Sequence, residues 1–178
     1  MDELLGGAIL GLTYGKVRVV DSHPGWPGAF QAIAADLRLA LGSLASAIEH
    51  VGSTAVSGLA AKPILDIAIG LAPGVDAARV IAILEPLGWV HRGDKGDAGL
   101  LLVLEDRPAH RVAHAHVVRY RGTSWQRYLA FRDRLRSDPV ARDAYTQLKR
   151  GLAEQFADDR RAYTAAKDSF IAGLLAGS

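Results

Sequence analysis

Hydrophobic residues recur along the chain with two periods, one typical of helices and one typical of strands. The helical period predicts a helix over 29–41 that ends at Gly42, and a second helix that starts at the N-cap residue Asp76 and ends at Gly88. Short β-branched or continuously apolar runs, bounded by Gly and Pro, predict strands. The predicted strands span 13–20, 46–51, 64–69, 89–92, 100–105 and 114–120.

Three of the predicted strands follow one another closely, over 89–120. The tract 93–99, rich in Gly and Asp, separates the first from the second, and the turn Asp106-Arg107-Pro108 separates the second from the third. Short connections of this kind join antiparallel neighbours, so we expect an antiparallel meander in this region.

The pattern becomes helical again from Thr123 onward. Helices are predicted to start near residues 123, 139 and 161, and the last is predicted to end near Leu175. Helices that follow a sheet in this way indicate the α+β class. We expect one domain over 1–178, with a mixed β-sheet and flanking helices within about 13–121 and a helical part within about 123–176.

The composition is typical of a globular protein and excludes several kinds of site. Of the 178 residues, 49% are hydrophobic and 22% are charged, and the absence of cysteine excludes disulfides, thiolate metal sites and cysteine nucleophiles. The formal net charge of +2 is too small to indicate a nucleic-acid partner. Asp2 and Glu3 stand where a signal peptide needs basic residues, and the apolar run 64–72 is too short to span a bilayer. We therefore expect a cytoplasmic protein with no membrane association.

Arginines are concentrated in the segment 107–136, in which Asp133 is the one acidic residue. They are Arg107, Arg111, Arg119, Arg121, Arg127, Arg132, Arg134 and Arg136. Such a segment could favour a phosphate-bearing ligand. Alternatively, its arginines cover a strand edge and one helix face, and Arg132 pairs internally with Asp133.

A candidate phosphate site lies where the predicted strand 46–51 ends. Gly52 and Ser53 open a glycine-rich loop whose backbone N–H groups and hydroxyl suit a phosphate group. Asp66, on the next predicted strand, could hold a divalent cation against the same phosphate. Lys62 could reach the phosphate as a point charge, or could simply be an exposed side chain ahead of a proline.

Several motifs resemble the GrpB family, whose members are regarded as nucleotidyltransferase-like. The most specific are Glu49 to Val56, Gly58-Leu59, Ala61-Lys62-Pro63-Ile64 and Asp66-Ile67. Others that resemble the family are Asp21 to Pro27, His114 to Val118, Phe131 to Arg136 with Pro139, Tyr145 with Leu148-Lys149, and Asp159-Arg160 with Tyr163 and Lys167. The resemblance covers about 17–175 and departs at Ser57, where the family usually has proline.

This resemblance implies a nucleotidyltransferase-like fold, with the Gly-Ser loop on one strand and catalytic carboxylates on its neighbours. Active transferases of this superfamily carry an Asp-x-Asp or Asp-x-Glu pair, because two Mg²⁺ ions need several anionic oxygens. Here Ala68 stands at the second position, on the strand face that carries Asp66. The sequence therefore lacks one of the carboxylates that active nucleotidyltransferases of the superfamily carry.

Two histidines could complete a different kind of site. His114 and His116 are two residues apart on a predicted strand and share one face of it. With Asp66 they would bind a divalent metal, Mg²⁺ or Mn²⁺, with Zn²⁺ or Ni²⁺ as the ions that imidazole favours more. Asp66 and His116 are then the candidate catalytic residues. The alternative is that both histidines are hydrogen-bonded structural residues, and His50 and His110 are weaker candidates.

Two functions follow from these residues. In the first, the protein binds a nucleotide or another phosphorylated small molecule at Gly52, Ser53, Lys62 and Asp66, with metal-dependent nucleotidyl or phosphoryl transfer as its reaction. In the second, it is a non-catalytic module that assists the folding or activity of a partner such as dephospho-coenzyme A kinase, because similar domains occur fused to that enzyme. Ala68 favours the second function, whereas the loop, Asp66 and the histidine pair favour the first.

Overall fold

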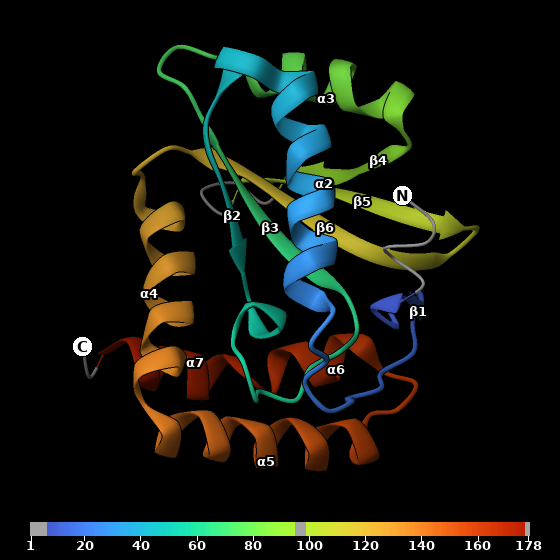
Figure 1. Cartoon of the computed structure of the whole chain (residues 1–178). Helices are drawn as coiled ribbons and strands as arrows, with labels where there is room; N and C mark the ends of the chain where they lie inside the picture. Colours follow the sequence, from blue (N-terminus) through green and yellow to red (C-terminus); the bar gives the residue numbers. More distant parts are fainter. Residues whose placement is uncertain (1–6, 95–98, 177–178) are drawn as a thin grey trace.

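The structure of the protein is a computed structural model that describes residues 7–94 and 99–176. Within these residues, six strands form one sheet and helices pack against it (Figure 1). The strands are β1 (Leu12–Thr13), β2 (Ala45–Val51), β3 (Leu65–Leu71), β4 (Trp89–Asp94), β5 (Leu100–Arg107) and β6 (His110–Arg119). The helices are α2 (Trp26–Leu41), α3 (Ala77–Leu84), α4 (Thr123–Ser137), α5 (Pro139–Gln155), α6 (Arg160–Ala165) and α7 (Asp168–Ala176).

The strands lie in the order β2-β3-β6-β5-β4, and β1 pairs with the start of β6. The β3–β6 pair is parallel and the other pairs are antiparallel. The predicted mixed sheet of an α+β protein is therefore confirmed, and β4, β5 and β6 form the predicted meander. Residues 95–98, which belong to the predicted connection 93–99, lie outside the described residues.

Local sequence signals explain where the first helices begin and end. Helix α2 starts at Trp26 with Pro27 in its first turn, where the missing proline N–H costs no hydrogen bond. It ends at Gly42, whose φ of 49° lies in the region that favours glycine. Asp76 caps α3 as predicted, because its carboxylate accepts a hydrogen bond from the N–H of Ala78.

The predicted strand over 13–20 is wrong beyond its first residue. Strand β1 contains only Leu12 and Thr13. The chain then turns at Gly15, whose φ is 92°, and its backbone bonds lead to separate parts of the molecule. The N–H of Val17 donates to the carbonyl of Ala157, and Val20 pairs with Ala61 outside the sheet. The β-branched residues of this segment predict a strand, but the segment bonds to two separate parts of the described chain and does not pair along one neighbouring strand.

The predicted third C-terminal helix is two helices in the structure. Asp159 accepts hydrogen bonds from the N–H groups of Arg161 and Ala162 and so starts α6. The helix ends at Ala165, and the N–H of Lys167 bonds back to the carbonyl of Thr164 before α7 starts. The turn between α6 and α7 is short, so the spacing of apolar residues across it is almost that of a continuous helix. The sequence pattern therefore predicts one helix.

The two faces of β3 have different coverings. Ile67 and Ile69 are fully buried in the cluster that contains Phe30 of α2. Ala68 points to the opposite face, where it is fully buried in a smaller cluster with Trp125 of α4. Alternate residues of this one strand therefore support two separate apolar layers.

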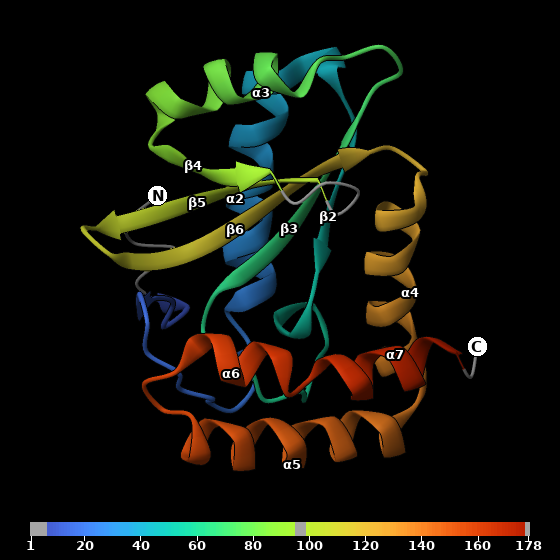
Figure 2. The ribbon, with the colours of Figure 1, turned by 180° about the vertical axis from the view of Figure 1, so that it is seen from behind.

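A layer of helices closes one end of the sheet. Helices α5, α6 and α7 lie beneath the end at which β2 finishes and β3 begins (Figure 2). An apolar cluster that includes Leu59, Leu135 and Tyr145 packs α5 and α7 against α4 and the loop after β2. Side chains at the start of β3 consequently lie close to the C-terminal helices. Within the described residues, no helix is long and apolar enough to cross a membrane.

Candidate functional site

Asp66 lies near the start of β3, directly opposite Val51 at the end of β2. The next residue, Gly52, has a φ of 67°, and a Cβ atom there would lie 2.6 Å from Oδ2 of Asp66. Only glycine fits this backbone conformation and this close approach. The Gly-Ser loop and Asp66, which the sequence predicts to act together, are therefore in contact.

The parallel pairing of β3 with β6 brings both candidate histidines to Asp66. Residue 66 lies opposite His114, and residue 68 lies opposite His116. Nε2 of His116 donates a hydrogen bond to Oδ1 of Asp66 over 3.1 Å, and Nδ1 of His114 lies 3.4 Å from the same oxygen. In a neutral His116, Nδ1 then accepts the hydrogen bond of the Tyr128 hydroxyl, over 3.1 Å. One carboxylate oxygen is thus shared by two imidazole rings.

These contacts favour the ionised form of Asp66. Partial burial opposes ionisation, but the hydrogen bonds and charges of His114 and His116 hold the pKa of Asp66 well below its usual range. The pKa of His114 is lowered mainly by burial, although Asp66 opposes that shift. The Asp66 side chain is still 34% exposed, and it presents a carboxylate to the space beside it.

That space is a cavity of about 190 Å³ between the start of β3 and the C-terminal helices. It is lined by Ser53, Lys62, Asp66 and both candidate histidines, together with cationic residues of the C-terminal helices. The cationic residues that line it are Lys62, Lys149, Arg160 and Lys167. Among the described residues that line it, Asp66 is the only carboxylate, so the cavity is strongly cationic.

Lys149 is the most buried of these cations. Its side chain projects from α5, and the residue is only 2% exposed. Nζ donates to Oγ of Ser53 over 3.1 Å and also contacts the carbonyl oxygen of Ala60. Nζ lies 4.5 Å from the centroid of the Tyr145 ring. None of these partners carries a negative charge, so the charge of a protonated Lys149 is not neutralised by them.

The lysines of the cavity disfavour one another's charged forms. Burial, followed by repulsion from Lys167 and Arg160, lowers the pKa of Lys62 to about 8. Burial, and then Lys167 and Lys62, lower the pKa of Lys149 well below its usual value. Burial, opposed by Asp66 and Asp168 and reinforced by Arg160, also lowers the pKa of Lys167. An anion in the cavity would relieve all three penalties at once.

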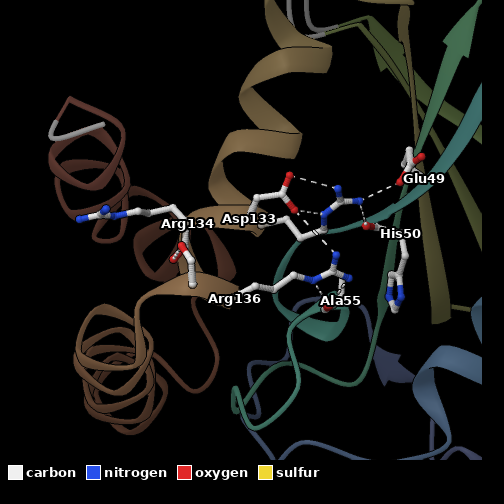
Figure 3. A network of polar contacts seen from close by, with 8 residues as sticks. Glu49, His50, Ala55, Asp133, Arg134 and Arg136 are labelled. Atoms are coloured by element: carbon white, nitrogen blue, oxygen red, sulfur yellow. Dashed lines mark hydrogen bonds and ion pairs between the residues drawn. The ribbon is translucent and has the colours of Figure 1, made fainter.

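Two arginines of the predicted arginine-rich segment have structural roles. Nη1 of Arg132 donates to Oε2 of Glu49 over 2.8 Å and to the carbonyl of His50, and its Nε donates to Asp133. Arg136 donates twice to the carbonyl of Ala55, over 3.1 and 2.8 Å (Figure 3). These bonds fasten α4 to β2 and to the loop that carries Ser53. The internal Arg132–Asp133 pair that the sequence suggested is present.

The structure gathers most of the residues predicted to act together. Ser53, Lys62, Asp66 and the histidine pair line one cavity, whereas Gly52 only packs against Asp66. His50 lies apart from the cavity. It pairs with Oγ1 of Thr54 over 3.0 Å and stacks on Phe30, with 4.6 Å between the ring centroids. His110 pairs with Asp106 in the β5–β6 turn, far along the strand from the candidate site.

The cations of the C-terminal helices were not predicted as site residues, although a signal for them exists. Lys149 follows Tyr145 by one helical turn, and Lys167 follows Tyr163 by one helical turn. Both tyrosines are almost fully buried, so Lys149 shares the buried face of α5 with Tyr145, and Lys167, in the turn after α6, lies over the ring of Tyr163. A lysine in register with a buried aromatic residue is unusual, and that pattern indicates a buried cation.

The candidate metal ligands are also together, but they bond to one another. Within the described part of the chain, no group of three His, Asp or Glu side chains is arranged to hold a metal ion. Active nucleotidyltransferases carry a second carboxylate two residues after the first. Here that position is Ala68, which is fully buried against Trp125 of α4. That part of the strand face is covered by apolar side chains and does not line the cavity.

Comparison with known proteins identifies relatives over most of the chain. A UPF0157 protein of Pseudomonas aeruginosa is 39% identical over 163 residues, which cover 90% of this chain and 66% of that protein. A dephospho-CoA kinase of Mycolicibacterium paratuberculosis is 34% identical in an alignment that is 180 residues long and covers 87% of this chain. The match covers only 44% of the kinase, so the chain spans less than half of that relative.

A solved structure and a family model agree with these matches. The crystal structure of the conserved protein GrpB from Enterococcus faecalis superimposes with a TM-score of 0.80 at 31% identity, and the match covers 90% of this chain and 96% of that one. This similarity is consistent with the nucleotidyltransferase-like fold that the sequence motifs imply. The model of the GrpB protein family matches residues 16–176. The chain therefore belongs to the GrpB family.

Proposed function

We propose that the protein binds a nucleotide or another phosphorylated small molecule, with a phosphate group in the cationic cavity. The observation that carries this proposal is the imbalance of charge in the cavity, where four cationic side chains face one carboxylate. Burying charges of one sign is costly unless a counter-charge compensates them. A phosphate supplies two negative charges and oxygen acceptors for several N–H donors at once.

The positions of the donors support a phosphate more than a simple halide ion. Nζ of Lys149 and Oγ of Ser53 are already hydrogen-bonded to each other, and both line the cavity. Nζ of Lys62 and Nζ of Lys167 lie 5.3 and 4.4 Å from the centroid of the Tyr163 ring, which lines the same cavity. Several donors from separate segments around a small cavity suit a tetrahedral group, which has an oxygen for each of them.

A divalent metal, which the sequence suggested as a cofactor, stays a prediction, and the donor set fits it poorly. Oδ1 of Asp66 is already shared by His114 and His116, and the neighbouring lysines repel a second cation. Two Mg²⁺ ions need more anionic oxygens than this single carboxylate provides. We infer that the lysines, and not a metal ion, supply the positive charge that a phosphate group requires.

Isothermal titration calorimetry with inorganic phosphate and with ATP tests the proposal. In Lys149→Met the charge is lost but the side-chain stem remains, so affinity should fall at least about tenfold, the equivalent of 1.4 kcal/mol. The matched control is Arg150→Gln, because Arg150 is the next residue of α5 and its exposed side chain pairs with Asp21. The control should bind both anions like the parent protein.

The same variant distinguishes binding from folding. Removing the buried charge removes its desolvation cost, but it also leaves Oγ of Ser53 and the carbonyl of Ala60 without their Lys149 donor, so the two effects on the free energy of unfolding oppose each other. A Lys149→Met protein that is folded and binds phosphate as tightly as the parent would refute the proposal. Titration with Mg²⁺, Mn²⁺ and Zn²⁺ in the absence of phosphate tests the metal prediction separately, with Asp66→Asn as the variant that should lose any such binding.

A second candidate function rests on the dephospho-CoA kinase of Mycolicibacterium paratuberculosis. Because that longer protein contains a region similar to this chain, we propose as the alternative that the domain assists such a kinase as a partner. Light scattering of this protein mixed with a dephospho-CoA kinase should then detect a complex, and the kinase should melt at a higher temperature in the mixture. Absence of both effects would remove this alternative and leave the phosphate proposal intact.

A further inference from the structure

A second group of cations lies next to the phosphate cavity. Arg92 of β4, Arg111 of β6 and Arg160 of α6 line a neighbouring cavity of about 380 Å³, together with Tyr14. The carboxylate that lines this cavity is that of Glu105. The three guanidinium groups come from separate elements, so the fold itself brings them together.

Glu105 is shared and does not balance the three arginines. Its Oε1 lies 3.2 Å from Nη2 of Arg92 and 3.6 Å from Nε of Arg111. Its Oε2 accepts a hydrogen bond from the N–H of Ala109 over 3.0 Å. Both oxygens are therefore engaged, and within the described residues no ion pair is formed by Arg160. The second cavity, like the first, has an excess of positive charge.

Arg111 gives the strongest support for anion binding in this cavity. It is only 7% exposed, and its Nε is a buried donor with no hydrogen-bond partner. Its guanidinium carbon lies 4.0 Å from the centroid of the Tyr14 ring, which holds the group against the wall of the cavity. Oε1 of Glu105, at 3.6 Å, is beyond hydrogen-bond distance of this Nε, and an anionic oxygen closer to it would satisfy the buried donor.

The two cavities have Arg160 in common. This side chain lines both of them, and it also lines a small cavity of about 10 Å³ together with Lys62 and His114 of the first lining and Arg111 of the second. We propose that the second cavity is a second anion subsite, and that the ligand is a small molecule with two linked anionic groups, such as a diphosphate or a bisphosphate. This inference rests on the proposed function, because the first anionic group occupies the lysine cavity.

Linear phosphates of increasing length provide the test, since each added phosphoryl group adds negative charge and carries it further from the first phosphate. Calorimetry is carried out with inorganic phosphate, pyrophosphate and tripolyphosphate on the parent protein and on Arg111→Gln and Arg92→Gln. Arg92 is 42% exposed on its side chain, so its variant should fold even if the buried Arg111 proves necessary for folding. Arg161→Gln is the control, because Arg161 is the exposed neighbour of Arg160 on α6 and lines neither cavity.

We expect the subsite variants to weaken the longer anions about tenfold and to leave inorganic phosphate unchanged, as the loss of one charge-assisted contact predicts. The control should bind all three anions like the parent. The inference is overturned if both subsite variants bind tripolyphosphate like the parent, or if they weaken all three anions equally. In either case the proposed function still stands where Lys149→Met alone abolishes phosphate binding. If none of the anions binds the parent protein, both proposals fail.

Discussion

The two faces of β3 differ in what burial does to the residues on them. On the face under α2, Ile67 and Ile69 are fully enclosed by apolar side chains, and burial stabilises the fold. On the other face, Asp66 opens onto a cavity whose buried lysines are penalised by their own surroundings. One strand thus carries a face that is apolar throughout and a face on which an apolar cluster around Ala68 lies beside a cavity with an excess of cations. The difference separates substitutions that should affect folding from those that should affect binding.

The largest effect is expected on the apolar face. Replacing Ile67 by alanine leaves a cavity in a closely packed cluster, and the free energy of unfolding should fall by about 2–5 kcal/mol. Urea denaturation measures this change. Leu39→Ala is the matched control, because Leu39 of α2 is 88% exposed and its truncation should cost less than about 0.5 kcal/mol. Equal losses in both variants would contradict the assignment of the core face.

The next effect comes from a titratable group on the same apolar face. Burial against Phe30, reinforced by the charges of Arg136 and Arg132 and opposed by Asp66, lowers the pKa of His50 to about 4. The unfolded chain binds the proton near pH 6.5, so stability falls as the pH drops from about 6.5 to about 4, by roughly 3 kcal/mol in total. Below about pH 4, protonation of His50 causes no further loss of stability.

Denaturation of the parent protein and of His50→Gln over this pH range measures the contribution. The glutamine variant should lose roughly that part of the acid sensitivity, because its side chain does not titrate. His114 and Asp66 also have lowered pKa values, so some acid sensitivity should remain in the variant. Identical pH profiles for the two proteins would show that His50 is not held neutral by its position.

The smallest effect concerns anion affinity on the polar face. The pKa of Lys62 is about 8, lowered by burial and by Lys167 and Arg160, so the free protein loses this charge as the pH rises above 8. A bound anion favours the protonated lysine, and binding should therefore weaken up to about tenfold per pH unit above 8. Calorimetry with sulfate, which does not titrate in this range, measures the effect.

Lys62→Arg is the matched variant, because a guanidinium remains protonated throughout this range. It should bind sulfate with an affinity that depends less on pH than that of the parent. If the parent shows no change in affinity between pH 8 and pH 10, Lys62 does not face the bound anion. That result would confine the anion to the side of the cavity that Lys149 and Ser53 line.

Much of the fold could be predicted because its signals are local. The periodicity of apolar residues, the Asp76 cap and the short connections of the meander each depend on neighbouring residues. The extended segment after Thr13 was misassigned because strand formation depends on a partner that is distant in sequence. The break between α6 and α7 was missed because the apolar spacing continues across it.

The candidate site was predictable where two residues share a strand, and less so where it depends on tertiary packing. The spacing of His114 and His116 placed both on one face, and the structure brings both to Asp66. The contact between Ser53 and Lys149 depends on how α5 crosses the end of the sheet, and no local pattern reports that crossing. Ala68 marked a departure from the carboxylate pair of active nucleotidyltransferases, and the structure adds that this residue is packed among apolar side chains.

The contact between Lys149 and Ser53 has a consequence for the time course of folding. These residues are 96 positions apart in the sequence, and Lys167 completes the same cavity from a still later segment. Contacts of such long sequence separation form late, after the loop between them has closed. A chain still emerging from the ribosome therefore has its sheet residues but no cationic cavity. Anion binding would report that synthesis and folding of the last helices are complete.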